Sequence, residues 1–121
     1  ISVESGVGWI PAFLEALDWQ WQNAGVGIEH PEYELLPSEY FRRQIYACFW
    51  FEREMIGRAA ELYPDNLMYE TDFPHPTSMS PGPATIAVHP RDYATQALGD
   101  LPKQVVAKLL HGNAARVFHL T

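Results

Sequence analysis

The sequence predicts an α/β protein with parallel strands, and two observations carry this prediction. Short apolar runs alternate with longer segments of helical period, in the order strand, helix, strand, helix, strand, helix, helix. Such alternation implies right-handed βαβ units and therefore a parallel sheet. The central apolar run, residues 44–51, shows little alternation, which is typical of a strand covered on both faces. The 121 residues, 47% hydrophobic, fit a single domain over 1–121.

The N-terminal part of the chain is expected to hold a strand and a long helix. Residues 1–4 predict a short strand, and the two glycines in residues 5–8 predict a turn. Pro11 suits the first turn of a helix, which should end near residues 23–25. The apolar stripe of this helix consists of Ile10, Phe13, Leu14, Leu17 and Trp21.

The middle of the chain is expected to add two further strands with a helix between them. Residues 25–37 are rich in glycine, proline and glutamate and predict a surface loop, after which Ser38 is expected to cap a short helical turn. The strand over 44–51 is followed by a helix over 53–63 and by a strand over 67–71.

The C-terminal part is expected to be helical. Prolines after the third strand predict a long irregular loop, and a helix follows over residues 91–98. Pro102 opens a fourth helix, which Gly112 is expected to break. Asn113 is then expected to cap a last short helix that ends at Leu120.

Composition excludes several classes of function. The net charge of −7 disfavours nucleic-acid binding, because an acidic surface repels phosphate. There is no apolar run of transmembrane length, so we expect a protein that does not enter the membrane. Cys48 is the single cysteine, which excludes an internal disulfide, fits a reducing, cytoplasmic compartment and predicts a buried thiol.

The strongest candidate for chemistry is Glu70-Thr71-Asp72-Phe73-Pro74-His75, at the end of the third strand. In parallel α/β folds the carboxyl ends of strands carry the active site. Asp72 can bind a divalent cation or act as a general base, and His75 can also bind a cation. The alternative is that Asp72 caps a turn and that His75 is an exposed loop residue.

Two further segments offer candidate residues near the same strand ends. Glu4 is another strand-end acid; a dinucleotide fingerprint is excluded there because Pro11 stands where its third glycine would be. The alternative for Glu4 is a pair with an arginine. Trp50 or Glu52 can face a strand-end pocket, or belong to ordinary aromatic packing. The candidate substrate-binding residues are Glu4, Trp50 and Trp9, which lies in the turn segment after Glu4.

Four segments together resemble the amidohydrolase-2 group of enzymes, which includes aminocarboxymuconate-semialdehyde decarboxylase and related aromatic-acid decarboxylases and hydrolases. They cover nearly the whole chain in the order expected for the C-terminal part of such an enzyme. These segments are residues 4–11 with Asp18 after them, 37–44 before a strand, 70–75 and 113–118.

The resemblance implies a (β/α)8 barrel of the TIM type with a divalent metal, most often zinc, and a small carboxylated or aromatic substrate. Asp72 matches the aspartate of the last strand, which binds metal and handles protons in the group. Glu4 falls where many relatives place a histidine and others a glutamate. His75 matches a histidine near the substrate in part of the group.

The chain departs from this pattern in what it lacks. His-x-His occurs nowhere in the sequence, although zinc usually takes three protein ligands and a water. A barrel of this type takes about 250 residues, so the chain is expected to supply about three βα units and the closing helices. Because it also begins at Ile1, we expect a C-terminal fragment of a hydrolase or non-oxidative decarboxylase that is inactive alone.

Three parallel strands leave open edges and an uncovered apolar inner face. We therefore expect the chain to form a homo-oligomer or to associate with a missing N-terminal part. The alternative function is that of a non-catalytic, stand-alone module that oligomerises through its open strand edges.

Overall fold

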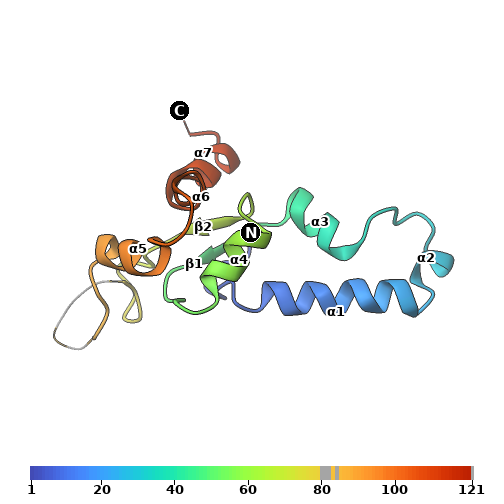
Figure 1. Ribbon diagram of the computed structural model, residues 1–121, viewed down its shortest axis with the longest axis horizontal. Coiled ribbons are helices and arrows are strands. Elements are labelled where there is room, and N and C mark those ends of the chain that lie inside the picture. Colours follow the sequence, from blue (N-terminus) through green and yellow to red (C-terminus); the bar gives the residue numbers. More distant parts are fainter. Residues whose placement is uncertain (80–82, 84, 121) are drawn as a thin grey trace.

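The structure, a computed structural model, describes residues 1–79, 83 and 85–120, and it confirms the α/β class. Residues 80–82 and 84, part of the predicted proline-rich loop, lie outside the described residues. Figure 1 shows the elements along the chain. They are α1 (Ile10–Asn23), α2 (Val26–Glu29), α3 (Pro37–Gln44), β1 (Ala47–Phe49), α4 (Ile56–Leu62), β2 (Leu67–Tyr69), α5 (Pro90–Leu98), α6 (Lys103–Ala107), the π-helical segment η1 (Lys108–Gly112) and α7 (Asn113–Val117).

The two strands pair in parallel, as the sequence predicts. Within the described residues they form a two-stranded sheet in which Cys48 lies opposite Met68. Both strands have three residues, so the predicted spans 44–51 and 67–71 were too long. The ladder ends where the amide of Glu70 donates to the carbonyl of Phe49, 3.0 Å away.

The predicted first strand, residues 1–4, is reduced to a single bridge between Ser2 and Ala47. The amide of Ser2 donates to the carbonyl of Tyr46 (2.8 Å), and the amide of Cys48 donates to the carbonyl of Ser2 (2.9 Å). Glu4 has φ 59°, a left-handed conformation that turns the chain out of the sheet. The prediction of a regular strand was wrong, but this segment does lie beside β1.

Helices cover one face of the sheet and form the core with it. Side chains alternate between the two faces of a strand, and on the covered face Ala47, Phe49 and Leu67 are fully buried. Tyr69 continues this face beyond Leu67. Its ring stacks on that of Tyr93 from α5, with centroids 5.6 Å apart.

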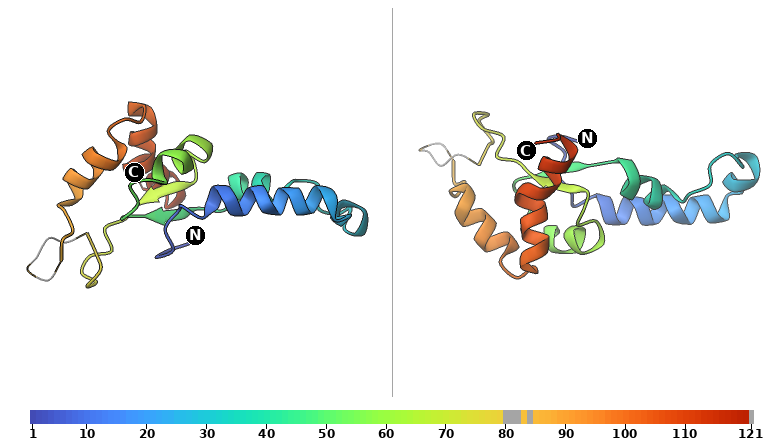
Figure 2. Two further views of the ribbon diagram at one scale, coloured as in Figure 1. Left: turned by 60° about the horizontal axis from the view of Figure 1, so that its bottom comes forward. Right: turned by 90° about the horizontal axis from the view of Figure 1, so that it is seen from above.

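Helices α1 and α3 lie side by side and extend away from the sheet, with α2 at their far end (Figures 1 and 2). The sequence did not predict α2. Ser38 does not cap α3; it lies inside the helix, and its amide donates to Oδ1 of Asp18 at 2.9 Å. Of the predicted stripe on α1, Ile10 and Leu14 are buried, whereas Phe13 is 52% exposed.

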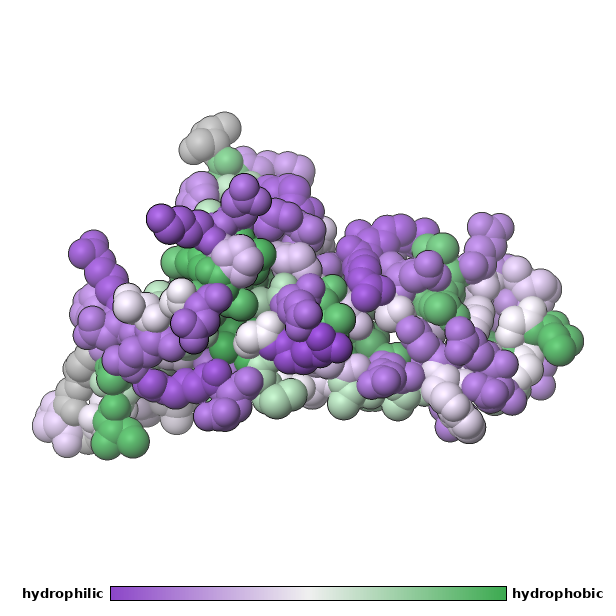
Figure 3. All heavy atoms as spheres, in the orientation of Figure 1, coloured by the Kyte–Doolittle hydropathy of each residue, from purple (hydrophilic) through white to green (hydrophobic). Residues whose placement is uncertain are grey.

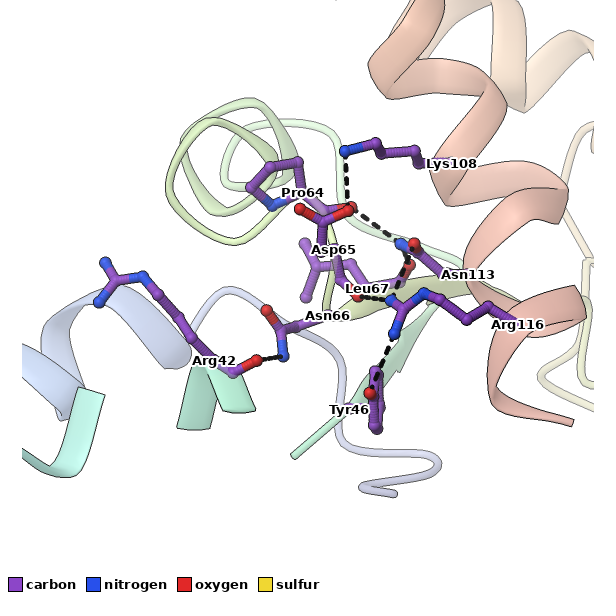
Figure 4. A network of polar contacts seen from close by, with 9 residues as sticks. All are labelled: Arg42, Tyr46, Pro64, Asp65, Asn66, Leu67, Lys108, Asn113 and Arg116. Carbon is purple, nitrogen blue, oxygen red and sulfur yellow. Dashed lines mark hydrogen bonds and ion pairs between the residues drawn. The ribbon is translucent and has the colours of Figure 1, made fainter. Parts of the chain in front are cut away.

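The C-terminal helices run without the predicted break. Gly112 has helical backbone angles, φ −61° and ψ −40°, so α6, η1 and α7 follow one another directly. Asn113 is therefore not a cap. Its buried side chain donates to the carbonyls of Pro64 and Leu67, both 2.8 Å away, and binds the helix to the start of β2 (Figure 4).

Polar groups cover most of the face seen in Figure 3, and apolar groups reach the surface near the sheet. The expectation that aromatic residues of an uncovered apolar face would be exposed was wrong for Phe49 and Trp50, which are buried. Phe51, the next residue, is 55% exposed. No helix in the described part of the chain has the length and apolar character needed to cross a membrane.

Candidate functional site

The carboxyl ends of β1 and β2 point the same way, because the strands are parallel, and acidic residues gather there. Glu70 and Asp72 follow β2. The parallel bridge of Ser2 to Ala47 leads the N-terminal segment along β1 toward its carboxyl end, so Glu4 comes near the same place. Strand ends of this kind carry the chemistry of parallel α/β proteins.

Asp72 and His75 lie in contact with each other. Nδ1 of His75 lies 3.3 Å from Oδ2 of Asp72, whose side chain is only 15% exposed. The amide of His75 donates to the carbonyl of Asp72 (2.9 Å), and Nδ1 also lies 2.9 Å from Oγ1 of Thr77. The Thr71 hydroxyl accepts from the amide of Phe73 in the turn. The Asp72 carboxylate faces the imidazole.

Glu4 and Asp72 share an uncommon backbone conformation, with φ 59° and 57°. Left-handed angles cost a residue with a Cβ roughly 1–2 kcal/mol, and such strain gathers at functional sites. Glu4 lies two positions after the bridge residue Ser2, and Asp72 lies three positions after the end of β2, where the chain leaves the sheet.

Glu70 and Cys48 form a pair that the sequence did not indicate. Burial raises the pKa of the Glu70 carboxyl, and the charges of Asp72 and Glu4 raise it further; the backbone of Glu4 and the thiol of Cys48 oppose this. Burial, followed by the charge of Glu70, raises the pKa of Cys48 to about 11. The period of two on β2 puts Met68 and Glu70 on one face, but only the register places Cys48 beside them.

Cys48 is therefore expected to resist alkylation. A thiol whose pKa rises from 9.0 to about 11 loses about 99% of its thiolate at pH 8. Reaction with iodoacetamide at pH 8 should be about 90-fold slower than for a free cysteine, because the rate follows the thiolate fraction. Mass spectrometry of the labelled protein measures this rate, and labelling in urea provides the control. A native rate close to the rate in urea would contradict the burial of this thiol.

The other candidate residues lie near the same turn. Trp9 is 38% exposed and its Nε1 donates to the carbonyl of Gly6 at 2.9 Å. Trp50 is buried, with its ring edge-on to Phe51. Glu52 is 8% exposed, and its Oε1 accepts from the amide of Val7 at 2.5 Å.

The described residues include no group of three or more histidine, cysteine, aspartate or glutamate side chains arranged to hold a metal ion. Asp72 and His75 are nevertheless ligand types that suit a borderline divalent cation. These residues therefore fit part of a metal site, and any complete site requires further donors.

Comparison with known proteins identifies the family to which the chain belongs. A model of the amidohydrolase family matches residues 1–120, so the chain belongs to the amidohydrolase family, in the amidohydrolase-2 group. This confirms the resemblance that the four segments indicated. No curated protein sequence matches the chain.

Among solved structures, the chain is similar to 5-carboxyvanillate decarboxylase LigW from Sphingomonas paucimobilis. The TM-score is 0.69 and the sequence identity is 30%. The match covers 96% of this chain but 33% of the decarboxylase chain. The chain thus spans about a third of the length of that enzyme, and its α/β structure corresponds to a fragment of an amidohydrolase barrel enzyme.

Proposed function

We propose that the chain forms the C-terminal part of a metal-dependent (β/α)8 barrel, in which Asp72 supplies one metal ligand and handles protons. The observation that carries this proposal is the Asp72 carboxylate at the end of β2, 15% exposed and 3.3 Å from the His75 imidazole. The family match and the likeness to a decarboxylase support it.

The reaction proposed is hydrolysis or non-oxidative decarboxylation of a small carboxylated or aromatic molecule. A divalent metal, zinc in the simplest case, would supply Lewis acidity and orient the substrate. Asp72 accepts or returns a proton at its carboxylate, and His75, beside it, contacts the substrate. Glu4, Trp9 and Trp50 are proposed to line the substrate site from the N-terminal turn and the end of β1.

The remaining ligands are proposed to come from barrel strands that this chain does not contain. The match to a third of the decarboxylase supports this. The open edge supports it too: within the described residues, β2 pairs with β1 alone. We propose association either with those further strands or with a second copy, and we expect the 121 residues to be inactive alone. Light scattering of the 121-residue chain tests the second alternative, because a stable monomer contradicts association with a second copy.

The metal assignment is tested on the chain joined to its proposed N-terminal barrel strands. Bound zinc is measured by metal analysis, and activity is measured as turnover of 5-carboxyvanillate. Asp72→Ala should weaken zinc binding at least about tenfold, because a ligand is lost, and should abolish turnover. Asp100→Ala is the matched control, since Asp100 is an exposed aspartate after α5, and should retain both. Unchanged zinc binding in Asp72→Ala would remove Asp72 from the ligand set.

A further inference from the structure

Glu52 is buried at a junction of three segments beyond the end of β1. Its Oε1 accepts a hydrogen bond from the amide of Val7, 45 positions earlier in the chain. Its backbone carbonyl accepts one from the hydroxyl of Tyr93, which is 1% exposed and belongs to α5 (2.5 Å). One residue thus links the N-terminal turn, the segment after β1 and a helix.

The N-terminal turn is shaped to receive this carboxylate. Gly6 is buried and has φ +65°, and a Cβ built there would overlap Oε1 of Glu52. Glycine alone permits so close an approach at this φ. Phe51 also lies against the same point, with its Cζ 3.0 Å from that Cβ position. The glycine and the glutamate therefore fit one another.

The other oxygen of Glu52, Oε2, is buried and has no hydrogen-bond partner among the described residues. An apolar side chain would avoid the cost of this buried oxygen. A carboxylate, however, accepts a backbone N–H more strongly than a neutral group does. The glutamate therefore stabilises this place through its hydrogen bond with the amide of Val7.

Glu4 depends on this junction because it is held between two anchors. On one side Ser2 is bridged to Ala47. On the other side Val7 is bound to Glu52, and the carbonyl of Gly6 accepts from Nε1 of Trp9. Four positions separate Ser2 from Gly6, so loosening the second anchor frees the backbone of Glu4.

We propose that Glu52 is a positioning residue that holds the turn of residues 4–8 against β1 and so fixes the position of Glu4 near Glu70. Only its last step, the contribution of Glu4 to substrate binding, rests on the proposed function. The anchoring of the turn stands on the contacts of Glu52 and Gly6.

Hydrogen exchange at the amide of Val7 in the intact protein tests the anchoring. Glu52→Leu should raise its exchange rate at least about tenfold, because the acceptor is lost. Glu52→Gln should stay within about threefold of the wild type, because the amide oxygen still accepts. Glu54→Gln, an exposed neighbour, is the matched control, and the amides of α4 should be unchanged. Unchanged exchange at Val7 in Glu52→Leu would overturn the proposal.

If Glu52→Leu does not fold, Gly6→Ala provides the second variant, because its Cβ displaces the carboxylate while Glu52 remains. It should raise the exchange of Val7 similarly. Gly25→Ala is its control, since Gly25 also has a left-handed φ, 74°, but open space around it. If the amide of Val7 exchanges at the same rate in Gly6→Ala and Gly25→Ala, the proposal that Glu52 anchors the turn is wrong.

Turnover of 5-carboxyvanillate tests the last step. Glu52→Leu should raise KM at least about fivefold, and Glu52→Gln should restore it to within about twofold, because the turn is anchored again. If Val7 exchanges faster in Glu52→Leu but KM is unchanged, the positioning of Glu4 by Glu52 does not contribute to substrate binding. If the wild type does not turn over 5-carboxyvanillate, decarboxylation of this substrate is excluded, whereas the exchange rates still decide whether Glu52 anchors the turn.

Discussion

Replacing Asn66 by alanine is expected to lower the free energy of unfolding by about 2 kcal/mol, because a buried donor that lies within hydrogen-bond distance of three carbonyls is removed. Asn66 is 2% exposed. Its Nδ2 lies 3.1, 3.0 and 2.8 Å from the carbonyls of Phe41, Arg42 and Ile45. Since these belong to the last turn of α3 and the residue after it, the side chain closes the C-terminal end of that helix (Figure 4).

Equilibrium unfolding of the intact protein in urea measures this loss. Asn23→Ala is the matched control, because Asn23 also donates to a helix carbonyl, that of Trp19 at 2.7 Å, but is exposed. It should cost less than about 0.5 kcal/mol, because water replaces the lost bond. A loss below about 1 kcal/mol for Asn66→Ala would show that the helix end does not need this donor.

The periodicity of the sequence predicted most of the elements because the apolar spacing is local. The helix predicted over 91–98 begins one residue earlier, at Pro90, a residue that suits the first position. The strands were predicted too long because apolar content does not show where pairing stops. The turn at Glu4 could not be predicted, since a left-handed backbone at a glutamate has no signal in the sequence.

The sequence indicated those candidate site residues that lie close together along the chain. Asp72 and His75 lie three positions apart, and a strand end followed by prolines indicated both. The pair of Cys48 with Glu70 depends on the register between β1 and β2, which the sequence did not specify.

Glu52 shows the same limit at longer range. Its position after an apolar run indicated either a strand-end pocket or packing. Its actual partner, the amide of Val7, is 45 positions away and is a backbone group. No pattern of side chains reports such a contact. Gly6 was the one visible sign, because a glycine in a turn marks either a left-handed backbone or a close approach, and here it provides both.

Asn113 was predicted as a cap because asparagine at a helix start usually plays that role. The π-helical segment η1 instead continues the helix through Gly112, so that Asn113 faces the start of β2, where it is 2% exposed. Arg116, one turn later, donates to the carbonyl of Asp65 at 2.7 Å and lies 3.2 Å from the hydroxyl of Tyr46 (Figure 4). Helix α7 therefore binds the loop before β2 and the start of β2 through Asn113 and Arg116.

Replacing Asn113 by aspartate should cost more than replacing it by alanine. Alanine leaves the carbonyls of Pro64 and Leu67 without their donor, a loss of about 2–3 kcal/mol. Aspartate adds a carboxylate that points at these two acceptors and has no hydrogen to give, so we expect about 3–5 kcal/mol near pH 7. Arg116→Lys, at an exposed position, should cost about 1 kcal/mol or less. Urea unfolding ranks the three variants by their loss in free energy of unfolding.

Lowering the pH toward 4 should narrow the difference in free energy of unfolding between Asn113→Asp and Asn113→Ala, because a protonated carboxyl regains a donor. If aspartate is tolerated as well as alanine at pH 7, Asn113 does not bind the closing helix to the sheet through its N–H groups.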